Sequence, residues 1–270
     1  DSASSAIRGT AFSLRQALDT VGALLGPLLA IGLLYITANN FTFVLWFAVL
    51  PAIVCVTILL FKVKESVLEK TITKKKSSFF FHNILAIDSI LWFFLLVVFV
   101  FHLARFSEAF LLLRGLDIGL TVSLIPLIFV VMNATYAITA VPFGRLSDRF
   151  GPFRFILLGL FVLILANIVL ATSTSIWFLF VGIILWGIHL GATQGLLLAI
   201  VAQLSPTAMR GTSFGLFHTI TGIALFFASF VAGYLWQYYN ADLIFYVSAI
   251  ISTIGITAFI LWNWFYKNKY

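Results

Sequence analysis

The segment Ile176–Ala202, IWFLFVGIILWGIHLGATQGLLLAIVA, decides the fold class of this chain. It contains no Asp, Glu, Lys or Arg, and as a helix it is long enough to cross the apolar core of a bilayer, about 30 Å thick. A membrane-spanning β-strand would have only about 10 residues and would alternate apolar with polar side chains. The segment therefore predicts a transmembrane helix.

Seven further apolar runs of similar character predict seven more spans. They are Leu14–Tyr35, Phe41–Phe61, Ile90–Leu113, Val122–Phe143, Phe155–Ala171, Phe214–Leu235 and Leu243–Phe265. The whole chain of 270 residues is 62% hydrophobic and 9% charged, with a mean hydropathy of +1.13. Soluble domains carry about 25% charged residues, so this chain cannot cover a water-facing surface. An all-α membrane protein with eight transmembrane helices is predicted.

The positions of the basic residues predict the orientation of the spans. If Asp1 is cytoplasmic, all sixteen Lys and Arg residues except Arg105 and Arg114 lie at the cytoplasmic face. Arg105 is inside a predicted span, and Arg114 is in a predicted outer loop. Because cytoplasmic loops are rich in Lys and Arg, both ends of the chain are predicted to be cytoplasmic. This placement explains the net charge of +7, so no nucleic-acid partner is expected.

One long polar connection, residues 62–89, separates the first two spans from the other six. It contains Thr73-Lys74-Lys75-Lys76-Ser77-Ser78, which fits either a solvated linker or a site for anionic lipid headgroups. We therefore expect residues 1–61 to hold two helices of one bundle, 62–89 to be a cytoplasmic linker, and 90–270 to form a six-helix bundle.

Other classes of protein find little support in the sequence. Cys55 is the only cysteine, so a disulfide within the chain and a cysteine metal cluster are excluded, and no metal or cofactor is expected. There is no G-x-x-x-x-G-K-[ST], H-E-x-x-H or G-x-S-x-G segment. An ATP-driven pump and an enzyme are therefore not predicted.

An internal repeat relates the first span to the seventh. The segment Arg8-Gly9-Thr10-Ala11-Phe12-Ser13-Leu14 matches Arg210-Gly211-Thr212-Ser213-Phe214-Gly215-Leu216, with only the fourth and sixth positions different. Parallel repeats of six-helix halves occur in transporters. The second half has six predicted spans and the first has two, so we expect the chain to lack about four preceding helices, or about 120 residues. A natural eight-helix protein is the alternative.

The segment Gly144-Arg145-Leu146-Ser147-Asp148-Arg149-Phe150-Gly151-Pro152-Phe153-Arg154 resembles the signature loop of the major facilitator superfamily, G-x-L-(A/S)-D-R-x-G-x-(R/K)-(R/K). It lies between the second and third spans of the second half, as in that family, and Phe153 departs from the pattern. The resemblance implies a major facilitator-type helical bundle, of which this chain would hold helices 5–12 of twelve.

The same loop has a physical interpretation of its own. Gly144 and Gly151 would permit a tight turn, and Asp148 would be a lone carboxylate among arginines that include Arg149 and Arg154. Such a cluster could hold two helix ends together in one state and release them in another. A static turn is the alternative.

The first span resembles the fifth helix of major facilitator antiporters in the element Gly22-Ala23-Leu24-Leu25-Gly26-Pro27, although their final glycines are replaced by Ala30 and Ile31. This resemblance favours export of a solute against protons. Gly22 and Gly26 would also suit close helix packing alone, with Pro27 bending the helix.

Ionisable residues inside spans are the candidates for a transport site, because their burial is costly. His102, Arg105 and Glu108 recur every three residues, which would place them on one helical stripe with Arg105 and Glu108 paired. Arg15 with Asp19 at i,i+4 and His189 are further candidates. For each, a role in proton coupling or substrate binding competes with a structural pair or an interhelix hydrogen bond.

Together these features predict a secondary active transporter of a small organic solute, coupled to protons, with export favoured over uptake. Two bundles would rock around a central site. The alternatives are an uptake symporter and a non-transporting membrane sensor of the same shape. We expect it in the bilayer of a bacterial inner membrane, with a monomeric full-length form.

Overall fold

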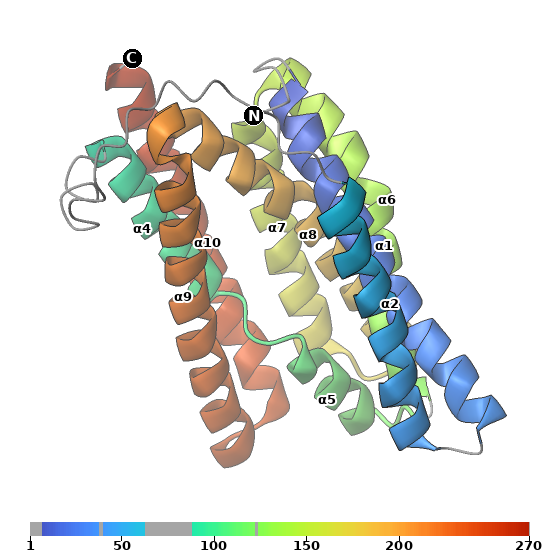
Figure 1. The fold of residues 1–270 in the computed structure, drawn as a ribbon. Helices are drawn as coiled ribbons and strands as arrows, with labels where there is room; N and C mark the ends of the chain where they lie inside the picture. The colour runs from blue at the N-terminus through green and yellow to red at the C-terminus, as the bar shows by residue number, and fades with distance from the viewer. Residues whose placement is uncertain (1–6, 38–39, 63–87, 122–123, 270) are drawn as a thin grey trace. The chain divides into compact units, whose positions relative to one another are not determined.

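The computed structural model describes residues 7–37, 40–62, 88–121 and 124–269, which are largely helical (Figure 1). Two helices come first, α1 (Arg8–Ile36) and α2 (Phe41–Lys62). After the predicted linker, most of which is outside the described residues, the chain forms α4 (Ser89–Leu103), α5 (Ala109–Asp117), α6 (Pro126–Phe150), α7 (Pro152–Thr172), α8 (Ile176–Leu204), α9 (Arg210–Tyr238) and α10 (Ala241–Lys269).

Six described segments are long and apolar enough to cross a membrane. They are Thr42–Phe61, Pro126–Phe150, Pro152–Thr172, Ile176–Leu204, Thr207–Tyr238 and Ala241–Asn268. The segment Ser89–Leu103 is apolar but shorter, and α1 is absent from this set. The predicted all-α membrane class is therefore confirmed, and the number of eight spans stays a prediction.

The predicted span Ile90–Leu113 is wrong as a single helix. It is divided into α4 and α5, and residues 104–108 between them are not helical. His102 is in the last turn of α4, Arg105 is in the break, and Glu108 precedes α5. The expected helical stripe of these three residues therefore does not exist, although a contact between Arg105 and Glu108 is retained.

By their contacts, residues 1–24 and 86–270 form one unit, and residues 25–85 form another. The boundary falls inside α1, so its first turns pack with the second half of the chain. The predicted division into 1–61, 62–89 and 90–270 stays a prediction. The following paragraphs concern the larger unit.

Helix α8 is the core of this unit, and it packs along both α6 and α7. Three glycines at four-residue spacing allow its neighbours to come close. A Cβ on Gly187 would lie 2.6 Å from the carbonyl oxygen of Met132 in α6, and one on Gly195 would lie 2.8 Å from the Cα of Ser13 in α1. Gly191 faces Thr139 and Ala140 of α6. Gly187, Gly191 and Gly195 thus form a close-packing face of α8.

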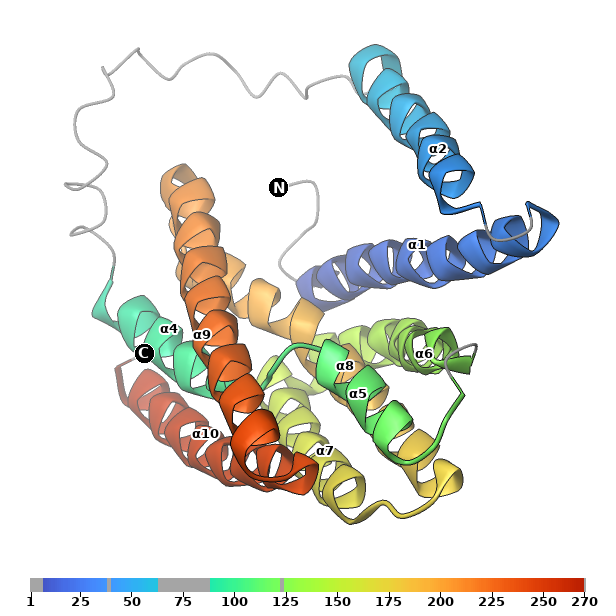
Figure 2. The same ribbon diagram turned by 90° about the horizontal axis from the view of Figure 1, so that it is seen from below.

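Aromatic side chains join α4, α7 and α10, of which α4 and α10 lie side by side in Figure 2. Phe153, which departs from the signature pattern, stacks on Phe259 with ring centroids 5.1 Å apart and an interplanar angle of 17°. Trp262 continues the stack and donates a 3.2 Å hydrogen bond to the carbonyl of Ile90. An aromatic contact therefore replaces the usual basic residue at this position.

Candidate functional site

The turn between α6 and α7 consists of a single residue outside helical geometry. The helix α6 continues through Gly144 to Phe150, and Gly151 then adopts a φ of +87°, a value that favours glycine. The sequence-based expectation of a loop from Gly144 was wrong, because Gly144 is helical. Its lack of a side chain serves close packing: a Cβ there would lie 2.6 Å from the Cβ of Ser13 in α1.

Asp148 binds the amino-terminal end of α1. Its Oδ1 accepts a 2.8 Å hydrogen bond from the backbone N–H of Gly9, and its Oδ2 accepts bonds from the N–H and the hydroxyl of Thr10, at 2.9 and 2.5 Å. The first N–H groups of a helix have no partner within it and carry partial positive charge. A carboxylate is therefore a favourable partner at this place.

The arginines of the signature segment do not pair with Asp148, contrary to the cluster expected from the sequence. Arg149 lies over the ring of Phe150, 5.1 Å from its centroid, and both Arg149 and Arg154 are exposed. Within the described ranges, the ion pairs found do not include Asp148. We call the contact of Asp148 with Gly9 and Thr10, together with the packing of Ser13 on Gly144 and Gly195, the α1 contact.

Alanine in place of Gly195 should weaken the α1 contact. The new methyl group would meet the Oγ, Cα and N atoms of buried Ser13 at 2.6 to 2.9 Å, and two of these atoms are backbone. Such overpacking costs about 1–3 kcal/mol. We expect a lower thermal midpoint for Gly195→Ala in purified protein.

Gly215→Ala is the matched control, because a Cβ at Gly215 in α9 would meet nothing within 4 Å. Alanine is the better helix former by about 0.5–1 kcal/mol, so this variant should be neutral or slightly more stable. Equal thermal midpoints for the two variants would contradict the close packing of α1.

The two copies of the sequence repeat meet near the α1 contact. The helices α1 and α9 begin at the equivalent residues Arg8 and Arg210, and each has 29 residues. The equivalent residues Phe12 and Phe214 have ring centroids 5.9 Å apart. Contact between equivalent residues of two repeats is the arrangement expected beside a pseudo-two-fold axis.

The break between α4 and α5 is held by two serines from other helices. Ser229 Oγ of α9 accepts a 2.9 Å bond from the N–H of Ser107, and the hydroxyl of Ser248 in α10 donates to the carbonyl of Ala104. Within a membrane, backbone groups released from a helix need such partners. The sequence carried no signal for either serine.

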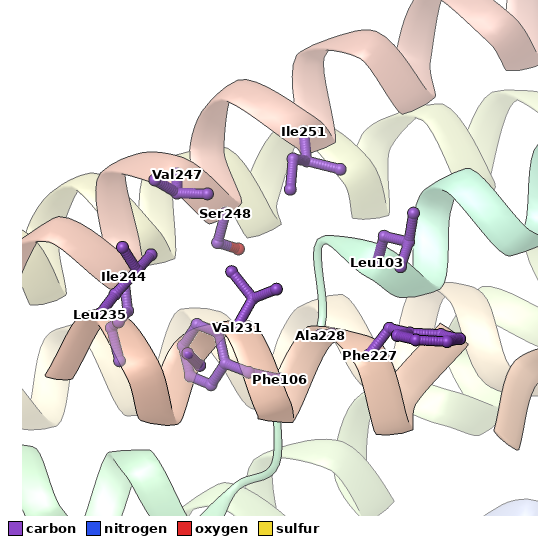
Figure 3. A pocket seen from close by; sticks show the side chains of 11 residues that line it. Leu103, Phe106, Phe227, Ala228, Val231, Leu235, Ile244, Val247, Ser248 and Ile251 are labelled. Carbon is purple, nitrogen blue, oxygen red and sulfur yellow. The ribbon is translucent and has the colours of Figure 1, made fainter. Parts of the chain in front are cut away.

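An apolar cavity of about 180 Å³ adjoins this break, between α9 and α10 (Figure 3). Leu103 and Phe106 are among its lining residues, and Ser248 contributes the single hydroxyl, which is already bonded to Ala104. The cavity therefore offers apolar surface and no ionisable side chain.

Arg105 lies in the break, and its side chain is only 8% exposed. Its nearest carboxylate oxygen is Oε1 of Glu108, 3.9 Å from NH2, in a side chain that is 34% exposed. With the Gln194 amide of α8 oriented to satisfy both groups, its oxygen accepts bonds from NH1 and NH2 of Arg105. The predicted pair of Arg105 and Glu108 is present, at a distance too long for a hydrogen bond.

The two histidines are buried beside Arg105 and bonded to backbone carbonyls. Nδ1 of His102 lies 2.8 Å from the carbonyl oxygen of Val98, and Nδ1 of His189 lies 2.9 Å from that of Gly159 in α7. The ring of Phe101 contacts both imidazoles. The bond of His189 to α7 is the interhelix hydrogen bond that the sequence left as one of two possibilities; its functional role stays a prediction.

Tyr136 of α6 was not predicted as a site residue. Its side chain is buried, and it lies within electrostatic range of Arg105. Asp19 is exposed and lies 4.0 Å from Arg15. We call Arg105, Glu108, Gln194 and Tyr136 the central polar cluster.

Arg114 is also buried, although the sequence placed it in an outer loop. It belongs to α5, at the opposite end of α7 from Gly151. It donates to the carbonyls of Leu170, Ala171 and Ser173 at 3.1–3.2 Å, and it pairs with Asp117 at 2.7 Å and Asp242 at 2.6 Å. A single arginine therefore connects α5, the last turn of α7 and the first turn of α10.

The antiporter-like element of α1 gains no packing partner here. The helix continues through Pro27, and a Cβ on Gly22 or Gly26 would meet no described atom within 4 Å. The role of Gly22, Gly26 and Pro27 stays a prediction.

The fold and the polar break define a polytopic helical membrane protein built on an internal repeat. A family model described as Major Facilitator Superfamily matches residues 109–269. The chain therefore belongs to the major facilitator superfamily, which is a family of membrane transporters and not of enzymes.

Individual relatives agree with this assignment. An uncharacterized MFS-type transporter of Methanocaldococcus jannaschii is 30% identical over 92% of this chain and 62% of its own length. The class B tetracycline resistance protein of Escherichia coli is 27% identical over 58% of this chain and 43% of its own. The chain thus spans less than two thirds of the length of these relatives.

A solved structure shares the fold over most of the chain. It is a bacterial homologue of the iron transporter ferroportin in an outward-facing state, with a TM-score of 0.64 and 18% identity. The match covers 94% of this chain and 65% of that one. At this identity the likeness concerns the fold alone.

Proposed function

We propose that this chain is part of a proton-coupled secondary transporter of a small organic solute, working by alternating access. The observation that carries the proposal is the α1 contact. Asp148 holds the first turn of α1 through three hydrogen bonds, all to atoms of Gly9 and Thr10. Contacts of this kind can break and re-form as two bundles rock.

The signature segment Gly144, Asp148, Arg149, Gly151 and Arg154 would be the conformational switch at the cytoplasmic face. The placement of basic residues supports this orientation. With the α1 contact formed and Phe12 against Phe214, the structure would be closed toward the cytoplasm. The membrane would be a bacterial inner membrane, with both chain ends cytoplasmic.

Glu108 is our candidate for the proton carrier. It is a carboxylate next to the break, within 3.9 Å of Arg105 and partly accessible. Broken helices commonly provide the substrate and ion sites of transporters. His102, His189 and Asp19 with Arg15 are weaker candidates, since both histidines are bonded to carbonyls and the Arg15–Asp19 pair is exposed.

Export is favoured over uptake by the antiporter-like element of α1 and by the relative that is a tetracycline resistance protein. An uptake symporter and a non-transporting sensor are the other candidates. All three would share the rocking bundles and the membrane setting.

Proteoliposomes that contain the protein and a pH-sensitive dye separate these functions. With an imposed pH gradient, an exported solute should move protons opposite to itself, and Glu108→Gln should exchange solute without moving protons. Proton movement in the same direction as the solute would identify a symporter. Binding without flux would identify a sensor, and solute flux without proton movement in the unaltered protein would exclude coupling.

A further inference from the structure

Two arginines of the divided helix are buried, and they differ in how their charge is satisfied. Arg105 lies in the break before α5, and its side chain is 8% exposed. Arg114 lies within α5, and its side chain is 7% exposed. A guanidinium has five N–H donors and is always charged in proteins. An arginine buried in a membrane protein therefore requires anionic or carbonyl partners.

Arg114 shows how this fold satisfies such a charge. All three of its nitrogens have partners: three backbone carbonyls and the carboxylates of Asp117 and Asp242. Both carboxylates lie within 2.7 Å of it. This is the pattern of a structural arginine.

Arg105 has no comparable set among the residues that the structure describes. Its Nε is buried without a hydrogen-bond partner. Its other two nitrogens share the one oxygen of Gln194, and the Glu108 carboxylate is 3.9 Å away. The guanidinium therefore retains donors, and nearly a full positive charge, that no close oxyanion neutralises.

The described groups around Arg105 include no closely bound anion. His102 and His189 direct Nδ1 at carbonyl oxygens, Tyr136 is a phenol, and Gln194 is an amide. Asp19 is held 4.0 Å from Arg15 and is exposed. Among the described residues, Glu108 is the one carboxylate that forms an ion pair with Arg105, and about one-third of its side chain is exposed.

We propose that Arg105 binds an anionic group of the transported solute, and that a carboxylate fits it best. A planar carboxylate can accept two parallel hydrogen bonds from the guanidinium, including one from Nε. Glu108 competes with this group for Arg105, because both are carboxylates beside the same cation. This inference rests on the proposed function and names the solute class of the same site.

Equilibrium binding to the purified protein in nanodiscs tests the proposal without requiring transport. The probes are matched acid and amide pairs of one shape, benzoate with benzamide and nicotinate with nicotinamide. Each is titrated at constant chloride concentration, by calorimetry and by the thermal midpoint. The acid of each pair should bind and raise the midpoint, because a ligand stabilises the state it binds, and its amide should not.

Two substitutions should change this preference in opposite directions. Arg105→Gln removes the charge and should weaken binding of the acids by about tenfold or more. Glu108→Gln removes the competing carboxylate and should strengthen it roughly threefold or more. Arg145→Gln, which removes an equal charge from an exposed position, should change neither.

The proposal would be overturned if the unaltered protein bound the acids and the amides equally, or bound neither. This comparison uses no variant, so it does not depend on whether a variant folds. Acid binding of unchanged strength in the Arg105→Gln variant would also overturn the proposal. Failure of the proposed function is distinguishable, since it would appear as absent flux in proteoliposomes while acid binding persists.

Discussion

Alanine at position 148 is expected to release the first turn of α1 and to leave insertion into the membrane intact. The substitution removes three hydrogen bonds, all to one carboxylate, of 2.5 to 2.9 Å. Bonds to a charged group contribute about 1.5–3 kcal/mol each, but bonds that share one carboxylate are not additive. We expect the α1 contact to weaken by about 3 kcal/mol, which is roughly a hundredfold in its equilibrium.

The Phe12–Phe214 contact provides a measurement of this effect. Both residues are replaced by cysteine in a Cys55→Ser background, which removes the single native thiol. A short bis-maleimide should join the pair rapidly in the parent, because the two rings are 5.9 Å apart. In Asp148→Ala vesicles the cross-linking should be far slower.

Three further variants test whether the change in cross-linking rate depends on the carboxylate of Asp148. Asp148→Asn keeps the shape and loses the charge, and Thr10→Val removes only the hydroxyl bond, so both should give intermediate rates. Arg145→Ala, on the same helix and exposed, should match the parent. Identical cross-linking in Asp148→Ala and the parent would show that the contact does not depend on Asp148.

Methionine at position 114 should produce a large loss of stability. It would remove the Arg114 donors from the carbonyls of Ala171 and Ser173, and one of the two side-chain donors from that of Leu170. It would also leave Asp242 without the cation 2.6 Å away. Removing one partner of a buried charged network costs about 3–5 kcal/mol. The thermal midpoint should fall by about 10 °C.

The companion variants separate charge from geometry. Arg114→Lys keeps the charge but lacks the planar fork that reaches several acceptors, so it should recover only part of the loss. Asp242→Asn should cost less than Arg114→Met, and the double variant should cost less than the sum of the two. Arg145→Met is the exposed control and should be neutral. Full additivity in the double variant would contradict a direct pair.

The apolar spans could be predicted from local amino-acid composition, and the repeat could be predicted from the sequence identity of its two copies. Residues 176–202 contain no Asp, Glu, Lys or Arg, and the segments that begin at Arg8 and Arg210 are identical at five of seven positions, so each pattern is visible in the chain itself. A helix begins at each repeat copy, several residues before the start of the predicted span. Gly144 was assigned to a turn because glycine is typical both of turns and of close helix packing, and sequence alone does not distinguish the two.

The sites depended on partners that sequence patterns do not mark. Asp148 binds backbone N–H groups, which every residue except proline has, so its partner at Gly9 had no signature. Ser248 bonds to Ala104 across 144 positions. Arg114 appeared to be an outer-loop residue because its burial depends on α7 and α10 folding over it. Such long-range contacts position the candidate site residues, and only the fold reveals them.

Phe153 has a consequence for how the protein responds to its surroundings. A basic residue at this position would interact with lipid headgroups and acidic side chains. Salt would screen that interaction, with a Debye length of about 10 Å at 0.1 M. The stack of Phe153 on Phe259 is apolar and is not screened. The contact between α7 and α10 should therefore hold at any ionic strength and beside any headgroup charge. The salt-sensitive groups of this segment are then the carboxylate of Asp148 and the exposed Arg145, Arg149 and Arg154.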